Sequence, residues 1–257
     1  MSIENTTSTQ MLREFKPQLE KPGTLTWAWI ILLVLIILFG IYALYVQITE
    51  GHIVTGMRDN VVWGIFIVNF IFFMGISYAG ALISGSLHLF KTSWRQPIIR
   101  IAELITIISL LIGPLYILLC IGRLDKLHYL VLFGRIQSPI TWDVIAISTD
   151  IIGCILFLYL SILRDIALLR DFNELKIPKW RKKMYKILAL GYTGLPEQKK
   201  RLQQATDIMA VMVIAIAIIV YSVLAWIFSV TLQPGWHSTI FGPYFVIAAV
   251  YSGSGVM

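Results

Sequence analysis

Charged residues and cysteines are both scarce in this chain, and each shortage excludes several classes of protein. Charged side chains make up 14% of the 257 residues, and 58% are hydrophobic, whereas soluble domains carry about 25% charged residues. The two cysteines, Cys120 and Cys154, lie in apolar stretches, without a CxxC pair or a Cys/His cluster. The sequence therefore indicates an integral membrane protein in which no zinc, iron–sulfur or haem site is expected, so no metal ligands are assigned.

Two further features are missing. Residues 1–26 are polar and contain no apolar core, so no secretory signal peptide is expected there. The formal net charge is +7. In a membrane protein such an excess of Lys and Arg usually reflects the topology, so it does not indicate nucleic-acid binding.

Six apolar segments predict an all-α, polytopic transmembrane helical bundle. They cover residues 27–46, 61–85, 98–121, 144–163, 208–231 and 243–257. Because a helix needs roughly 20 residues to cross a bilayer, the last segment is an incomplete span. We expect a second membrane bundle, or a missing C-terminal half, to cover it. Residues 1–26 form a tail outside this transmembrane domain of residues 27–257.

Lysine and arginine predict the orientation of the bundle. Most of them lie in the N-terminal tail, between the second and third segments, and between the fourth and fifth. The positive-inside rule then places the N-terminus in the cytoplasm. The longest inner connection, residues 170–206, is a basic amphipathic segment. It is interpreted as a helix on the anionic inner leaflet, as a topology anchor, or as a docking site for a cytoplasmic partner.

Acidic residues inside the apolar segments point to function. Asp143, Asp150 and Asp165 fall on one stripe of the fourth segment, which also holds Cys154. A carboxylate at the centre of a membrane helix costs about 2.5–3.5 kcal/mol on insertion scales and usually faces a proton, ion or ligand path. The alternative for Asp150 is a buried hydrogen-bond partner for a neighbouring helix.

Glu103 lies about one turn inside the inner boundary of the third segment. At a spacing of i,i+3, Arg100 and Glu103 can form an ion pair. This pair is read either as a proton-uptake site or as an interfacial ion pair without further role.

The predicted outer loops are rich in polar and titratable side chains. They include His52, Arg58, Asp59, Arg123, Asp125, His128, Arg135, Trp236 and His237. Oxidation of a quinol near this face needs a base for each hydroxyl group and an apolar slot for the ring. The predicted quinone site consists of Asp143, His128, Tyr129, Trp142 and Trp63. Electrons would leave to a redox centre outside the chain.

Two other classes compete with this interpretation. A proton- or ion-coupled secondary transporter also places polar residues near the midplane, but no pair of Gly/Pro-broken helices occupies matching positions. A purely structural membrane anchor leaves the intramembrane acids without a role.

An ordered series of motifs resembles a known family. The motifs are GHIVTGMRDNVVWGIFIVNFIFFMGISYAGALISG (51–85), LHLFKTSWRQPIIRIAELIT (87–106), IGR (121–123), SPITWD (138–143), RDIALLRD (164–171) and WHSTIFGPYF (236–245). Together they resemble the NrfD/PsrC family of quinone-interacting membrane subunits, which includes polysulfide reductase and alternative complex III.

The resemblance implies a menaquinol- or quinone-binding subunit with two four-helix bundles in a prokaryotic cell membrane. The second to fifth apolar segments would form the first bundle, and the sixth would open the second. It implies an iron–sulfur partner subunit, often beside a molybdopterin or haem subunit. Asp143 matches the acid of the family's WD element, and Glu103 the acid of its AE element, which belongs to a proposed proton path. In alternative complex III a histidine precedes the GR element, and Cys120 stands at that place here, so the resemblance adds Cys120 to the predicted quinone site. The hypothesis is that His128 replaces that histidine, or that Asp143 acts alone.

Overall fold

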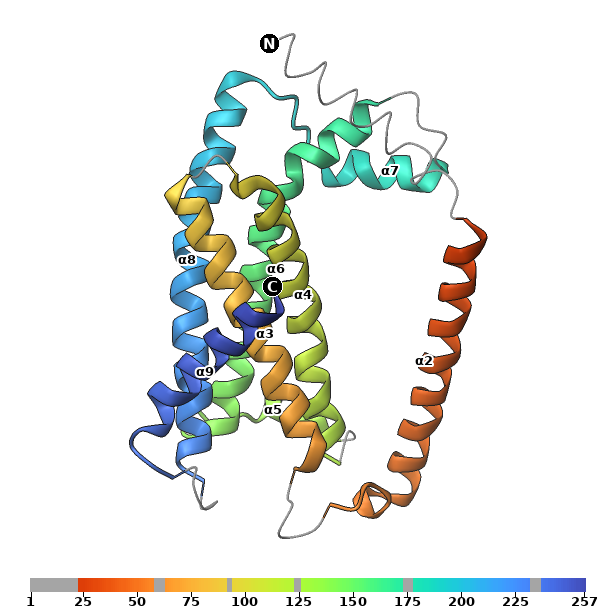
Figure 1. The fold of residues 1–257 in the computed structure, drawn as a ribbon, viewed down its shortest axis with the longest axis vertical. Coiled ribbons are helices and arrows are strands. Elements are labelled where there is room, and N and C mark those ends of the chain that lie inside the picture. The colour runs from red at the N-terminus through yellow and green to blue at the C-terminus, as the bar shows by residue number, and fades with distance from the viewer. Residues whose placement is uncertain (1–22, 58–62, 92–93, 123–125, 173–177, 232–236) are drawn as a thin grey trace. The chain divides into compact units, whose positions relative to one another are not determined.

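The computed structural model describes residues 23–57, 63–91, 94–122, 126–172, 178–231 and 237–257. The regular elements of these residues are all helices, drawn in Figure 1. They are α2 (Thr24–Glu50), η1 (His52–Thr55), α3 (Gly64–Phe90), α4 (Arg95–Cys120), α5 (Leu127–Leu132), α6 (Pro139–Asp171), α7 (Lys179–Leu188), α8 (Pro196–Ser229) and α9 (Phe241–Val256).

Five of these helices, α2, α3, α4, α6 and α8, are long and apolar enough to cross a membrane, and α9 is a shorter apolar helix. The predicted all-α polytopic bundle is therefore confirmed. A helix suits these segments because it satisfies every backbone amide internally, where lipid offers no hydrogen bonds. Several helices extend past the predicted apolar segments, since their polar end residues continue the helical hydrogen bonding beyond the hydrocarbon.

The chain divides into two compact units, and the larger one covers Glu50–Leu160 and Leu202–Met257. One hydrophobic core in this unit joins five helices. Its members include Phe70 and Met74 of α3, Leu110 of α4, Phe157 of α6, Tyr221 and Leu224 of α8, and Phe245 of α9. The core thus includes the predicted first bundle, α3, α4, α6 and α8, and also takes in part of α9.

Small residues allow α3 and α9 to pack closely. A β-carbon added at Gly253 of α9 would collide with the side chain of Ala79 and would lie 2.5 Å from the carbonyl oxygen of Gly75, both on α3. Helices in membranes often meet at such small residues, because the backbones can then approach each other. The predicted incomplete span, α9, is therefore held against α3.

The second unit covers Met1–Thr49 and Ser161–Arg201. In α2, no residue is buried. At the end of α6, Arg170 donates to the carbonyl oxygen of Tyr192 over 2.8 Å and pairs with Asp171 at 2.7 Å. Arg170 thereby holds the chain after α7 against the end of α6.

The helix α7 is amphipathic. Its apolar side chains Trp180, Met184, Ile187 and Leu188 fall on one side at helical spacing, and Lys179, Lys182, Lys183 and Lys186 fall on another. Trp180 is 66% exposed and Ile187 is 61% exposed. Within this unit, α7 therefore leaves its apolar side uncovered.

Candidate functional site

Asp143 lies in the second turn of α6, whose first residue is Pro139. Proline suits the first helical position, where its missing N–H removes no helical bond. The Oδ1 atom of Asp143 is buried and has no hydrogen-bond partner among the described residues. Leaving a buried acceptor unpaired costs about 1–3 kcal/mol, so this oxygen is suited to a donor that arrives with a ligand.

The two tryptophans predicted to hold the quinone ring make other contacts. Trp142 donates from Nε1 to the carbonyl oxygen of Ile136 over 2.7 Å, which ties the start of α6 to the preceding loop. Trp63 stands just before α3 and meets the ring of Phe228 edge-on at 6.1 Å. Both residues thus help to shape this end of the unit.

His128 and Tyr129 lie together on α5, with ring centroids 4.3 Å apart. Both are exposed. Within the described residues, neither forms a hydrogen bond with the buried Oδ1 of Asp143. Pairing of His128 with Asp143 stays a prediction.

A histidine outside the predicted quinone site lies against Gly122 of the IGR motif. His52 of η1 is half-buried, and its ring fills the space that a side chain at Gly122 would occupy. Gly122 has a φ of +75°, in the left-handed region that glycine tolerates best. His52 therefore contacts the chain at Gly122, two residues after Cys120. The sequence signal that could have identified His52 is its position in a short segment between two glycines, Gly51 and Gly56.

A cavity of about 280 Å³ opens beside η1 and the start of α3. Its lining consists of Thr55, Gly56, Met57, Gly64, Ile65 and Phe66. Asp143 does not line it. The volume lies just below the roughly 300–1,000 Å³ of typical small-molecule pockets.

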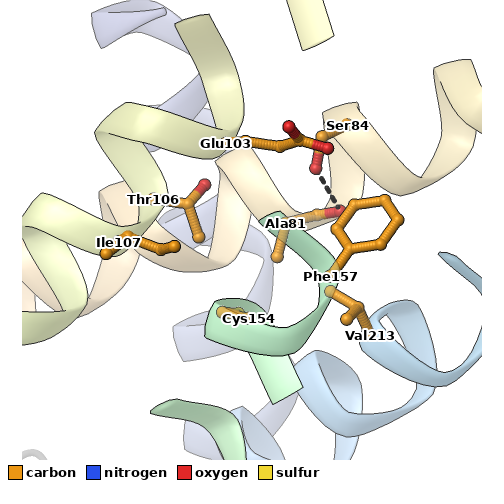
Figure 2. A pocket seen from close by; sticks show the side chains of 8 residues that line it. All are labelled: Ala81, Ser84, Glu103, Thr106, Ile107, Cys154, Phe157 and Val213. Atoms are coloured by element: carbon orange, nitrogen blue, oxygen red, sulfur yellow. Dashed lines mark hydrogen bonds between the residues drawn. The ribbon is translucent and has the colours of Figure 1, made fainter. Parts of the chain in front are cut away.

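A second, much smaller cavity adjoins Glu103 at the other end of the unit. It measures about 10 Å³ and lies among Ser84 of α3, Glu103 and Thr106 of α4, and Cys154 and Phe157 of α6, as Figure 2 shows. That volume is close to what one water molecule needs. The predicted Arg100–Glu103 ion pair is confirmed, with 3.9 Å between Nη1 and Oε2.

Asp150 is connected to this small cavity through Cys154. The thiol of Cys154 donates to Oδ1 of Asp150 over 3.5 Å, and Cys154 itself lines the cavity. Asp150 is 5% exposed. Asp165, by contrast, is exposed and belongs to the other unit. Glu103 thus lines the cavity itself, whereas Asp150 is linked to it by the hydrogen bond from Cys154.

Among the described residues, no group of three or more His, Cys, Asp or Glu side chains could hold a metal ion. Several polar residues of the predicted outer loops lie outside the described residues. They are Arg58, Asp59, Arg123, Asp125 and Trp236.

The sequence model described as polysulphide reductase, NrfD, matches residues 53–257. The chain belongs to the NrfD family. Within this NrfD protein, the match includes Asp143, Glu103 and Asp150, and it begins one residue after His52.

Three relatives extend this finding. A membrane subunit of Halobacterium salinarum, provisionally named as part of a dimethyl sulfoxide reductase, is 28% identical over 243 residues, covering 94% of this chain and 52% of the relative. A selenate reductase subunit of Mesobacillus selenatarsenatis is 22% identical, covering 86% and 53%. The Hdr-like menaquinol oxidoreductase integral membrane subunit of Archaeoglobus fulgidus is 24% identical, covering 96% and 53%. The NrfD protein thus spans about half the length of these relatives.

Proposed function

We propose that this NrfD protein is the quinone-binding membrane subunit of a quinol:acceptor oxidoreductase complex in a prokaryotic cell membrane. The proposed substrate is menaquinol, which would bind near the outer face at the Asp143 end of the larger unit. The name of the Archaeoglobus relative, a menaquinol oxidoreductase subunit, supports the choice of substrate. The predicted cytoplasmic N-terminus supports the orientation.

The observation that carries this proposal is the buried Oδ1 of Asp143, without a hydrogen-bond partner among the described residues. A quinol hydroxyl group is a donor of suitable size, and a carboxylate accepts both its hydrogen bond and then its proton. Oxidation removes two protons and two electrons from each quinol. Asp143 would take one proton, and a second base would take the other.

Two histidines are candidates for the second base. His128 follows from the sequence prediction and lies exposed beside Tyr129. His52 is favoured by its burial, since its Nε2 atom is buried against Gly122. The cavity beside η1 would take part of the ring or tail of the quinol.

The electrons would pass to an iron–sulfur partner subunit, beside a molybdopterin or haem subunit of the same complex. The reductase names of the two other relatives support such a complex. Protons would move along Glu103, Cys154 and Asp150, with Asp165 as a further acid on α6. The cavity that adjoins Glu103 and Cys154 supports this path, because one water can bridge groups too far apart for direct transfer.

The test is quinol-dependent reduction of the iron–sulfur partner in the purified complex. We expect Asp143→Asn to lower kcat by about 10²–10⁴-fold, the usual contribution of a general base. Asp143→Glu is expected to retain partial activity, and Glu197→Gln, which changes an exposed acid at the start of α8, is the control. Unchanged kcat in Asp143→Asn would refute the site. A complex without redox partners would instead favour a secondary transporter.

A further inference from the structure

His88 lies in the last turn of α3, one turn beyond Ser84, which lines the Glu103 cavity. Its side chain is 12% exposed, and its Nε2 atom is 3.4 Å from Oδ1 of Asp207 on α8. Its ring meets Phe157 of α6 edge-on at 5.9 Å. A titratable ring that is largely shielded from solvent thus lies where three helices meet.

Asp207 connects His88 to water. Its side chain is 29% exposed and accepts a hydrogen bond from Nε2 of Gln203 over 2.8 Å. Its other oxygen lies 3.7 Å from Nζ of Lys91, a side chain that is 65% exposed. One carboxylate therefore contacts both an exposed ammonium group and a largely shielded imidazole.

Two residues that line the cavity are neighbours of His88. Ser84, which lines the cavity, precedes His88 by one turn of α3. Phe157, which His88 contacts, lines the same cavity and is labelled in Figure 2. Thus His88 and the Glu103 cavity share the Phe157 ring, and Ser84 and His88 lie one above the other on α3.

We propose that His88 and Asp207 form the proton-uptake site that supplies the Glu103 cavity from the inner face, past the edge of the Phe157 ring, which contacts His88 and lines the cavity. This inference rests on the proton path of the proposed function and adds its inner end. A proton from water would reach the imidazole beside Asp207. The ring would release a proton to a water molecule in the cavity, which has room for about one, and Glu103 would accept the proton from that water. Each transfer moves one proton, and the imidazole returns to its neutral form.

Imidazole suits this task because one ring nitrogen can accept a proton while the other releases one. Lys91, Arg95, Arg100 and Asp207 are the charged groups that act on His88. Arg95 also donates from Nη1 to the carbonyl oxygen of His88 over 2.7 Å, which fixes the backbone there. Lys91 pairs with the other oxygen of Asp207, so Lys91→Gln changes the surroundings of this carboxylate but leaves both proposed proton carriers in place, and it serves as the control.

The experiment uses the whole complex in proteoliposomes, with a pH-sensitive dye enclosed on the side that faces the Glu103 end. Proton uptake from that side is measured during turnover, together with electron transfer to the partner. We expect His88→Gln to slow the uptake at least about 10-fold, because glutamine cannot carry the proton. Asp207→Asn is expected to slow it several-fold, and Lys91→Gln to leave it within about twofold. Imidazole added on the same side is expected to restore part of the rate in His88→Gln.

Four results would overturn the inference. Normal uptake in His88→Gln, while Asp143→Asn abolishes electron transfer, would remove the uptake site and leave the proposed quinol function intact. Parallel loss of uptake and electron transfer without rescue by imidazole would assign His88 a purely structural role. Wild-type turnover without uptake from the inner side would remove both the path and its inner end. If His88→Gln fails to assemble, normal uptake in an assembled Asp207→Asn complex decides against the proposal.

Discussion

Replacing Gly122 by alanine tests whether the position of the His52 ring matters for quinol oxidation. The new methyl group would collide with Nε2 of His52 and would lie 2.7 Å from its Cδ2 atom. Since carbon atoms in contact stay about 3.5–4.0 Å apart, the ring has to move by about 1 Å. A displacement of about 1 Å in a catalytic group can cost about 10²-fold in rate. We therefore expect kcat/KM for quinol to fall by about 10- to 100-fold.

Alanine at position 122 also strains the backbone, because its φ is +75°. Placing a residue with a side chain in the left-handed region costs about 1–2 kcal/mol. Gly191→Ala is the matched control: Gly191 has a φ of +71°, and a side chain there would meet nothing within 4 Å. Both variants are expected to lose similar stability in thermal unfolding in detergent.

The assay is quinol-dependent reduction of the partner by the purified complex, at equal amounts of assembled protein. We expect Gly122→Ala alone to lose activity and His52→Gln to reproduce that loss. Equal activity in Gly122→Ala and Gly191→Ala would show that the position of His52 has no part in the reaction.

Three further predictions concern packing, lipid contact and the small cavity. Gly253→Ala is expected to lower the free energy of unfolding by about 1–3 kcal/mol, because the new methyl group overpacks against Gly75 and Ala79. The control Gly255→Ala, with open space around it, is expected to cost less than about 0.5 kcal/mol. Thermal unfolding measures both, and equal losses would contradict the α3–α9 packing. The emission of a fluorophore on a cysteine that replaces Ile187 of α7 is expected to shift to shorter wavelengths when the proteoliposomes contain anionic lipid. The emission of the same fluorophore at position 183, in place of Lys183, is expected to stay unchanged. Identical shifts would reject a helix lying on the inner leaflet. Cys154→Ala is expected to slow proton uptake through the Glu103 cavity while quinol binding stays unchanged; normal uptake would show that the Cys154–Asp150 contact is only structural.

Local spacing was enough to predict much of this protein. Each long apolar run became a helix, because a chain in lipid has to satisfy its backbone internally. The Arg100–Glu103 pair followed from i,i+3 spacing. Asp150 and Cys154 were assigned to one stripe, but their hydrogen bond was not predicted.

Contacts between distant segments were beyond such reasoning. His52 meets Gly122, and His88 meets Asp207, only because separate helices pack together. A pattern along one segment predicts which side of a helix is polar, but it does not identify the residue on the facing helix. The quinone prediction therefore included His128, a residue close in sequence to Cys120, and did not include His52.

Transfer of a proton from quinol to the carboxyl group of Asp143 is the step on which the proposed function depends. Infrared difference spectroscopy of the complex, recorded between the quinol-bound and oxidised states, tests this step most directly. We expect a carbonyl stretching band of a newly protonated carboxyl group that shifts in heavy water and is absent from Asp143→Asn. The same band in Asp143→Asn, with unchanged quinol oxidation, would contradict this role of Asp143.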